Sequence, residues 1–561
     1  MKKILIATLV LFASVSVFAQ LSTKQLPRSF KMDINYSSIP TIPTIKMQSP
    51  DVDALLAQDE ENSKNLFKPQ RCATIIPLES NFFDDAMHLS LSDADIYLLK
   101  VNIPYAQALN LYSSNFYIPK GGELYLWNPS HSKVLGAFTS DNNSESGYFA
   151  TDYVYDDEIV FEYYQPKSIR ETASIELSEI GYFYRDVINY EEIKISEDEK
   201  MYKGGFRTSG NCHINANCSE GDDYRDVQRA VCRILIRMSY YDTGWCTGTL
   251  INNTNEDKTP YVLSAGHCIE EVASNNYYGQ FVFYFNYESS GCSTPTQEPS
   301  YTSLTGCTRL AFDNTYANNG SDYWLMRLQN SVPQSMNPYW AGWSRSTSTS
   351  RNGVCFHHPN GDIKKIASYR TALTTSKYND NADHAQHWIV RWAQTDNGLG
   401  VTEGGSSGSG LFNEDGKLIG TLSGGYAYCG QAASNQIDYY GKFNQHFSNI
   451  SQWLDPAGTD QTELGGRDYN NASSIDEVSE NALSLSIYPN PAKDFITINI
   501  DGGKEKTIVA IMDYVGRTVL SDEISEGITE TTLNISSLEP GTYFVRIYSN
   551  KNSVVKKITK E

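Results

Sequence analysis

The sequence TEGGSSGSGLF, from Thr402 to Phe412, decides which fold and which chemistry this chain carries. Between Gly404 and Gly410 it holds three serines and four glycines. That composition fits a flexible linker, and equally a tight turn that holds a nucleophilic serine. A serine hydroxyl is a poor nucleophile until a histidine takes its proton and an acid orients that histidine. The order of these partners along the chain therefore indicates which serine reacts.

One candidate nucleophile is Ser406, the serine of a G-x-S-x-G pattern that spans residues 404–408. In the α/β-hydrolase fold this pattern is a strained strand-to-helix turn, and the acid and the histidine follow the serine. After Gly410 the only histidine is His446, and the nearest plausible acid is Asp438. Helices between parallel strands are not predicted either. An α/β-hydrolase-type esterase that uses Ser406 is therefore the disfavoured alternative.

The opposite order, histidine before aspartate before serine, selects Ser407. His267 follows an apolar strand and a small-residue turn in PYVLSAGHCIE, and Asp322 precedes an apolar strand in GSDYWLMRL. These segments and residues 405–409 resemble the histidine, aspartate and serine motifs of chymotrypsin-like serine proteases. Each motif alone is weak. Three in the right order, with Cys268 beside the histidine, are much less expected by chance.

Each residue of this candidate triad has a chemical task. His267 would take the proton of Ser407 during attack on a carbonyl and then pass it to the leaving amine. Asp322 would fix the imidazole tautomer and stabilise the imidazolium. The backbone N–H groups of Gly405 and Ser407 would hold the oxyanion. Losing one such donor typically costs about 3–4 kcal/mol of transition-state stabilisation.

The composition of the whole chain is that of an exported protein. Lys2 and Lys3 precede a mostly apolar run that ends in small residues, which predicts a signal peptide over residues 1–19. The net charge of the 561 residues is −21, which disfavours nucleic acid or an anionic membrane as a partner. The ten cysteines fit an oxidising compartment, and nine of them lie between Cys212 and Cys429.

Strand patterns dominate the sequence, so we expect an all-β protein of several domains. Alternating segments such as IYLLKVNI and EIVFEYY predict an N-terminal β-sandwich over residues 20–207. The cysteine-rich residues 208–456 would form the double β-barrel of a chymotrypsin-like protease. A polar, glycine- and serine-rich stretch predicts a linker over 457–482. Strand patterns then return, so residues 483–561 should form a small Ig-like β-sandwich.

Residues 208–456 most closely resemble the bacterial lysyl endopeptidases. The likeness lies in CTGTLINNTNEDKTPYVLSAGHC, SDYWLMRL, WAGWSR, HHPNGDIKKIAS and GVTEGGSSGS. It implies three disulfides, Cys246–Cys268, Cys212–Cys429 and Cys218–Cys292. A fourth pair, Cys232–Cys355, is our own expectation, because it would join two barrel strands.

The resemblance also implies a pocket for a basic side chain. Lysyl endopeptidases supply its aspartate nine residues past a cysteine, which here is Asp438 after Cys429. A buried carboxylate pairs with a cation and rejects neutral side chains. The substrate backbone would pair with the strand that ends in Ser423, Gly424 and Gly425. The family has histidine where Ser423 stands, so we expect cleavage after basic residues generally, with lysine favoured over arginine.

Residues 483–561 resemble the type IX secretion sorting domain of Gram-negative bacteria. The likeness lies in YPNPAKDFITINI, GRTVL and LEPGTYFVRI. It implies the type IX secretion machinery as a partner and a secreted or cell-surface location. Residues 20–207 would then be a propeptide, and basic residues near its end, such as Arg207, would suit self-cleavage.

These observations predict a secreted, monomeric serine endopeptidase that acts on proteins and peptides, with no cofactor and no metal. The rival hypothesis is a non-catalytic surface protein that binds or adheres through a protease scaffold. The complete triad favours the enzyme, because a degenerate scaffold would tend to lose it.

Overall fold

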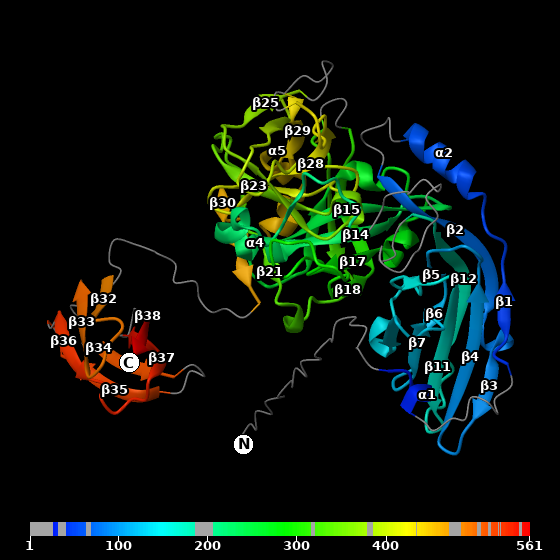
Figure 1. Cartoon of the computed structure of the whole chain (residues 1–561), viewed down its shortest axis with the longest axis horizontal. Helices are drawn as coiled ribbons and strands as arrows, with labels where there is room; N and C mark the ends of the chain where they lie inside the picture. Colours follow the sequence, from blue (N-terminus) through cyan, green and yellow to red (C-terminus); the bar gives the residue numbers. More distant parts are fainter. Residues whose placement is uncertain are drawn as a thin grey trace, which may run out of the picture. The chain divides into compact units, whose positions relative to one another are not determined.

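The regular secondary structure of the described residues is mostly β-strand (Figure 1), as the strand patterns predicted. The computed structural model describes residues 26–31, 41–62, 69–185, 206–315, 320–377, 385–432, 435–469, 484–501, 507–513, 518–525, 527, 529–548 and 553–561. The expected signal peptide, residues 1–19, lies outside these ranges. The chain divides into two compact units, Met1–Asn470 and Asn471–Glu561. Among the described residues, no helix is both long and apolar enough to cross a membrane.

The N-terminal part of the first unit contains two sheets that enclose one core. Its strands are β1 (Thr44–Lys46), β2 (Gln70–Asn81), β3 (Met87–Ser90), β4 (Ala94–Asn102), β5 (Ala108–Ser113), β6 (Phe116–Tyr117), β7 (Glu123–Trp127), β8 (Val134–Phe138), β9 (Phe149–Ala150), β10 (Val154–Tyr155), β11 (Glu158–Pro166) and β12 (Ser174–Phe183). One sheet has the order β1-β4-β11-β7-β8 and the other the order β10-β5-β12-β2. Leu99, Leu111 and Phe161 are among the apolar residues buried between them. This is the expected β-sandwich.

Three short helices accompany this sandwich. They are α1 (Arg28–Lys31), α2 (Val52–Asn62) and α3 (Phe82–Asp85). The side chain of Asn81 caps α3 by accepting a hydrogen bond from the backbone N–H of Phe83, which satisfies a donor that the helix itself leaves unpaired.

The next described part of the unit contributes seven antiparallel strands to a larger sheet, and these strands form the first barrel. Its strands are β14 (Val231–Arg237), β15 (Asp242–Ile251), β16 (Tyr261–Ser264), β17 (Val282–Phe285), β18 (Thr302–Thr305), β19 (Cys307–Asp313) and β20 (Tyr323–Leu328). They pair in the order β18-β17-β14-β15-β16-β20-β19. The helix α4 (Arg225–Ala230) leads into β14. Val262, Phe283 and Trp324 lie in the buried core.

A second antiparallel sheet forms the second barrel. It contains β13 (Ile214–Asn215), β23 (Gly353–His357), β24 (Lys365–Tyr369), β25 (Thr374–Ser376), β26 (His387–Arg391), β27 (Gly410–Asn413), β28 (Leu418–Gly425) and β29 (Ile437–Lys442). The order is β13-β24-β23-β27-β28-β29-β26-β25. The amphipathic helix α5 (Phe443–Leu454) buries Phe443, Phe447 and Ile450. The two barrels are the chymotrypsin-like architecture that the sequence predicted.

The N-terminal sandwich and the first barrel share a sheet. Strand β2 pairs antiparallel with β15, from Gln70 opposite Trp245 to Thr74 opposite Asp242. A common apolar cluster includes Phe183 of the sandwich and Trp245 of the barrel. The sandwich is therefore packed against the barrels as part of one compact unit.

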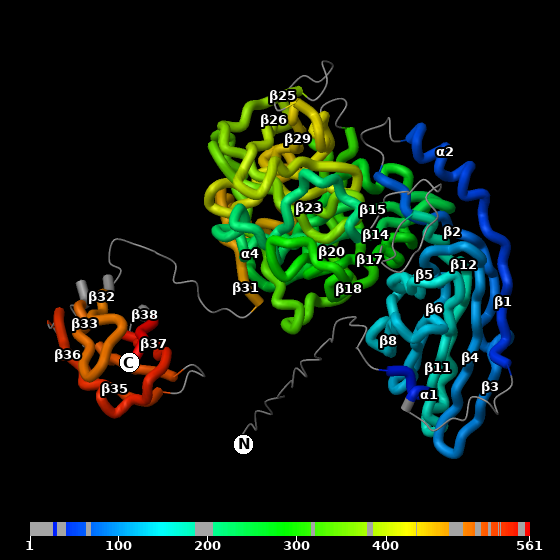
Figure 2. Tube along the Cα trace, viewed as in Figure 1, coloured from blue at the N-terminus to red at the C-terminus, as the bar shows by residue number. Residues whose placement is uncertain are grey.

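The expected linker begins later than its polar composition suggested. Strand β30 (Glu463–Leu464) pairs with β22 (Trp343–Ser344), and β31 (Arg467–Asp468) pairs with β21 (Tyr339–Trp340). Strand β31 lies beside α4 (Figure 2), where Arg229 and Asp468 form an ion pair of 2.7 Å. Because Leu464 is buried in the barrel core, the residues up to Tyr469 belong to the first unit.

The second unit is a small sandwich of seven strands. They are β32 (Ser484–Tyr488), β33 (Phe495–Asp501), β34 (Thr507–Met512), β35 (Thr518–Ile524), β36 (Glu530–Asn534), β37 (Gly541–Tyr548) and β38 (Ser553–Lys560). They form two sheets, β32-β33-β36 and β35-β34-β37-β38. Apolar residues such as Ile498, Val509 and Val545 fill the space between the sheets.

Three disulfides join the cysteines for which the resemblance implied pairing: Cys212–Cys429, Cys218–Cys292 and Cys246–Cys268. The fourth expected pair does not form. The sulfur of Cys232 contacts the backbone oxygen of Gly248 at 3.7 Å, and that of Cys355 contacts Ser409 Oγ at 3.2 Å. Both thiols are buried and satisfied within their own barrels, so Cys232–Cys355 was wrong.

Candidate functional site

His267 and Asp322 form a buried, hydrogen-bonded pair between two strands of the first barrel. His267 lies in a short 3₁₀ turn, Gly266–Ile269, that follows β16, and Asp322 lies just before β20. Because β16 and β20 are neighbours in the sheet, the two side chains meet. His267 Nδ1 is 2.8 Å from Asp322 Oδ2, and the backbone N–H of His267 donates to Oδ1 at 2.9 Å.

The surroundings of Asp322 favour its charged form. Burial opposes ionisation, but the charge of His267, its two hydrogen bonds and a hydrogen bond from Ser423 hold the pKa of Asp322 below its usual range. The backbone of Asp322 is left-handed, with φ +56°, which few residues with a β-carbon adopt. The carboxylate is thus held as an anion in a fixed position.

Ser407 lies next to the histidine turn. Its backbone oxygen accepts a hydrogen bond from the N–H of Thr247 on β15 at 2.8 Å. The sulfur of Cys268 lies 4.0 Å from the same oxygen, and the disulfide Cys246–Cys268 ties the histidine turn to β15. The structure therefore brings the serine, histidine and aspartate segments together across the two barrels.

The glycines around Ser407 form a fixed turn instead of a linker. Gly405 and Gly408 have φ values of +89° and +82°, where glycine carries no steric penalty. A β-carbon on Gly408 would lie 2.1 Å from Ser264 Oγ and 2.6 Å from the N of Ala265. No larger residue fits there without displacing the strand that leads to the histidine turn.

Ser406 points to a different partner. Its hydroxyl is 2.8 Å from His357 Nδ1 and accepts a hydrogen bond from the N–H of Glu403 at 3.2 Å. The acid and histidine that an esterase would need lie elsewhere. Asp438 contacts Trp392 and Thr402, and the ring of His446 contacts the backbone oxygen of Ser321. These contacts, together with the all-β fold, contradict the α/β-hydrolase alternative.

Asp438 is another fully buried carboxylate, on the strand that pairs with the expected substrate strand. It lies on β29 opposite Gly425 of β28. Trp392 Nε1 donates to Oδ2 at 2.6 Å, and Thr402 Oγ1 donates to the same oxygen at 2.7 Å. Burial raises the pKa of Asp438 to about 6 against the effect of these donors. Trp392 and Thr402 were not recognised from the sequence, since nothing in their local pattern indicates a buried acid.

Ser423, Gly424 and Gly425 lie at the end of β28. Pairing with β27 covers the earlier part of the strand, up to Thr421 opposite Gly410. Pairing with β29 continues through Gly424 and Gly425. The strand's last residues therefore extend past the pairing with β27, as a strand that receives an extended peptide requires.

His387 was also not recognised from the sequence. It is the first residue of β26, and its Nε2 lies 3.1 Å from Ser423 Oγ. Burial lowers the pKa of His387 to about 4. Only the three-dimensional pairing of β26, β29 and β28 brings this histidine near Asp322.

Two other places among the described residues gather side chains that could bind a ligand. Ligand atoms of His213, Glu403 and Cys429 lie within 4.8 Å of one another. The sulfur of Cys429 is in the disulfide with Cys212, so it cannot act as the thiolate that a metal ion binds. His213 Nε2 instead lies 3.3 Å from Glu403 Oε1.

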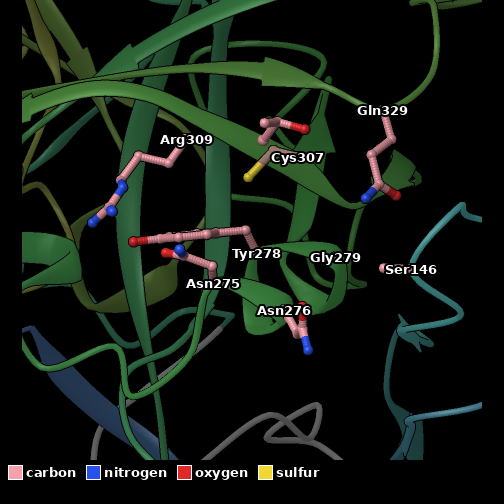
Figure 3. Close-up of a pocket in the computed structure, with 9 residues that line it drawn as sticks. Ser146, Asn275, Asn276, Tyr278, Gly279, Cys307, Arg309 and Gln329 are labelled. Atoms are coloured by element: carbon pink, nitrogen blue, oxygen red, sulfur yellow. The ribbon is translucent and has the colours of Figure 1, made fainter.

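A cavity of about 250 Å³ opens beside β19. Cys307, Arg309 and Tyr278 line it, together with Ser146 from the N-terminal sandwich (Figure 3). None of His267, Asp322 and Ser407 is among its lining residues.

Two segments of the chain match models of known families. Residues 206–441 match the lysyl endopeptidase C-terminal domain, and residues 486–561 match the secretion system C-terminal sorting domain. The first match contains the three triad candidates and Asp438. The second marks the protein as secreted or placed on the cell surface. Both likenesses expected from the sequence are thereby confirmed.

Individual proteins match over part of the chain. A lysyl endopeptidase of Pseudomonas aeruginosa is 31% identical over 264 residues, which are 46% of this chain and 54% of that protein. The chain therefore spans about half the length of the curated relative it matches. A solved Glu endopeptidase in complex with MPD is 15% identical and covers 44% of this chain and 99% of its own, with a TM-score of 0.28.

Proposed function

We propose that residues 208–456 are a secreted serine endopeptidase that cleaves after basic residues, with lysine favoured over arginine. The observation that carries the proposal is the buried His267–Asp322 pair beside the turn that holds Ser407. It occurs within the segment that matches the lysyl endopeptidase domain. The class of substrate is proteins and peptides.

In the proposed mechanism Ser407 attacks the substrate carbonyl while His267 takes its proton. Asp322 keeps the proton on Nδ1, so that Nε2 is the basic nitrogen. The backbone N–H groups of Gly405 and Ser407 hold the oxyanion in both steps. His267 then protonates the leaving amine, and a water molecule releases the acyl group by the reverse sequence.

The proposed specificity residue is Asp438. A buried carboxylate with a raised pKa is poorly satisfied until a cation replaces lost water. A lysine or arginine side chain would supply that cation, while the substrate backbone pairs with Ser423, Gly424 and Gly425. A neutral side chain would leave the charge unpaired, which disfavours its binding.

The flanking segments have proposed roles in export and maturation. The C-terminal sandwich would be the address that the type IX secretion machinery reads. Residues 20–207 would be a propeptide, since β2 lies along β15 and Gln70 packs against the turn before Ser407. A β-carbon on Gly404 would be 3.2 Å from Gln70 Oε1. Such a position suits a segment that covers the turn holding Ser407.

The rival role, a non-catalytic binding protein, is less well supported. Burying a charged aspartate beside a histidine costs free energy of desolvation. A scaffold selected only for binding has no need for such a pair, whereas a catalytic site uses both groups. We therefore keep adhesion as the alternative that the experiment must exclude.

The experiment is digestion of a denatured protein by the mature enzyme, followed by mass spectrometry of the new termini. A preparation of Ser407→Ala serves as the control for contaminating proteases. We expect cuts after lysine, fewer after arginine and none with the variant. Cuts spread over neutral residues would refute the role of Asp438, and equal activity of the variant would refute the enzyme.

A further inference from the structure

The triad aspartate has a polar neighbour beyond the histidine that it orients. Hydrogen bonding by Ser423 is one of the causes that lower the pKa of Asp322, and the hydroxyl of Ser423 lies 3.1 Å from Nε2 of His387. His387, Ser423 and Asp322 are all fully buried. They come from three segments far apart in the sequence: the start of β26, the end of β28 and the turn before β20.

We propose that His387 is a positioning residue of the triad, which acts through Ser423 to hold the carboxylate of Asp322. This inference rests on the proposed serine endopeptidase function and adds a residue to its machinery. His387 itself touches neither the substrate nor the reacting atoms.

The direction of the hydrogen bonds follows from what each group can donate. An ionised carboxylate only accepts, so the single hydroxyl proton of Ser423 goes to Asp322. The oxygen of Ser423 must then accept from His387, which requires the tautomer that carries its proton on Nε2. Without His387 the hydroxyl of Ser423 has an additional rotational choice, and its bond to Asp322 is less well held.

The need for such support is visible in the backbone. Asp322 has a left-handed conformation, φ +56°, that persists only where surrounding contacts hold it. Thr421, two residues before Ser423 on β28, also donates to the backbone oxygen of Asp322 at 3.2 Å. Strand β28 therefore contacts Asp322 at two places: Thr421 binds its backbone oxygen and Ser423 binds its carboxylate.

Several other charged or titratable groups face His387. They are Asp322, His446 of α5, Lys442 of β29 and Asp313 at the end of β19. Burial, His446 and Lys442 lower the pKa of His387, whereas the two aspartates raise it. The imidazole is thus neutral over the range in which the protease would work, and it acts as a fixed hydrogen-bond donor.

The test compares His387→Ala, His387→Gln and Ser423→Ala by the pH profile of kcat/KM. With His387 removed, the hydrogen bond from Ser423 to Asp322 weakens, and the carboxylate interacts more strongly with the imidazolium of His267. The acid limb of the profile, where kcat/KM falls as His267 takes up a proton, should therefore move to higher pH in His387→Ala. We expect kcat to fall about 3- to 10-fold, the usual worth of one such hydrogen bond. His387→Gln keeps an N–H donor and should retain most of the activity and the original limb.

The double variant separates positioning from simple stabilisation. Because His387 acts through Ser423, His387→Ala should add little to Ser423→Ala. The control is Trp388→Phe, the next residue on β26, which loses a buried hydrogen bond to Ile419 without a link to Asp322. It should lower thermal stability and leave the acid limb in place. Fully additive effects, or an acid limb unmoved by His387→Ala, would overturn the proposal.

A measurement without turnover keeps the test separate from the proposed function. The full-length chain carrying Ser407→Ala can be titrated by NMR, with the His267 ring followed directly. His387→Ala in this background should raise the titration midpoint of His267. If the midpoint is raised but the mature wild-type protein cleaves no peptide, the enzyme is refuted and the positioning role stays intact. An unchanged midpoint would refute the positioning role, whatever the activity.

Discussion

Two fully buried carboxylates, Asp322 and Asp438, lie in contrasting environments. Asp322 receives hydrogen bonds from an imidazole, a backbone N–H and a hydroxyl, and its pKa is lowered. Asp438 receives them from an indole, a hydroxyl and the backbone N–H of Ala427 at 3.4 Å, and its pKa is raised to about 6. The two carboxylates are equally buried, yet their pKa values are shifted in opposite directions.

The difference lies in whether the protein itself supplies a group that can pair with the carboxylate. Asp322 has the imidazole of His267 as a fixed partner, whose Coulomb interaction and hydrogen bond lower its pKa despite burial. The neighbours of Asp438 are neutral, so its charge is only partly compensated. In the proposed function, Asp322 orients the catalytic histidine, and Asp438 binds the cationic side chain of the substrate.

The largest expected effect comes from removing the charge of Asp322. Asp322→Asn keeps the shape but no longer favours the imidazole tautomer that the triad needs. We expect kcat to fall by roughly 10⁴-fold, measured on a lysyl peptide with thermal unfolding as a check on folding. A loss smaller than tenfold would mean that Asp322 has no role in orienting His267.

The second effect concerns specificity. Asp438→Asn should lower kcat/KM for a lysyl substrate by about 10³-fold, since breaking a buried ion pair costs roughly 3–5 kcal/mol. The rate on a neutral norleucyl substrate should change little. The matched control is Asp415→Asn in the exposed turn between β27 and β28, which should alter neither substrate. Equal losses for both substrates would remove Asp438 from the pocket.

The same substitution should stabilise the free enzyme. The pKa of Asp438 is raised from 3.8 to about 6 in the native state. The proton that Asp438 binds therefore stabilises the native state fully below pH 4, and this stabilisation is lost as the pH rises through 6. The shift corresponds to roughly 3 kcal/mol. Asp438→Asn should therefore raise the free energy of unfolding by about this amount at pH 8 and hardly at pH 4. Denaturant unfolding at the two pH values measures it, and destabilisation at pH 8 would contradict the account.

The smallest effect is a pH dependence of selectivity. Below pH 6 Asp438 gains its proton in the free enzyme, so preference for lysine over norleucine should fall about tenfold per pH unit. The titration of His267 cancels in the ratio of the two kcat/KM values. If the ratio of kcat/KM for lysine to kcat/KM for norleucine stays constant from pH 8 to pH 5, Asp438 is not the group that binds the charged side chain of the substrate.

The sequence alone predicted those site residues that lie within local motifs. His267, Asp322 and Ser407 are each recognisable within a short segment, and their order along the chain indicated the fold. The strand patterns likewise predicted both flanking sandwiches. Local patterning suffices there because alternation and turn residues depend on neighbours in the chain.

The rest depended on contacts between distant segments. Cys232 and Cys355 looked like a pair, but their thiols find acceptors within their own barrels. Residues 463–468 looked like linker, yet they pair as strands with β22 and β21. His387, Trp392 and Thr402 reach their carboxylates only through strand pairing, which no short-range pattern of the sequence contains.

The most direct test of the central claim is labelling of the mature protein with a phosphonofluoridate, followed by peptide mapping. The account predicts one label on Ser407, lost in Asp322→Asn at short reaction times and kept in Asp438→Asn, because the second carboxylate acts on the substrate and not on the nucleophile. No label, or a label on Ser406, would contradict it.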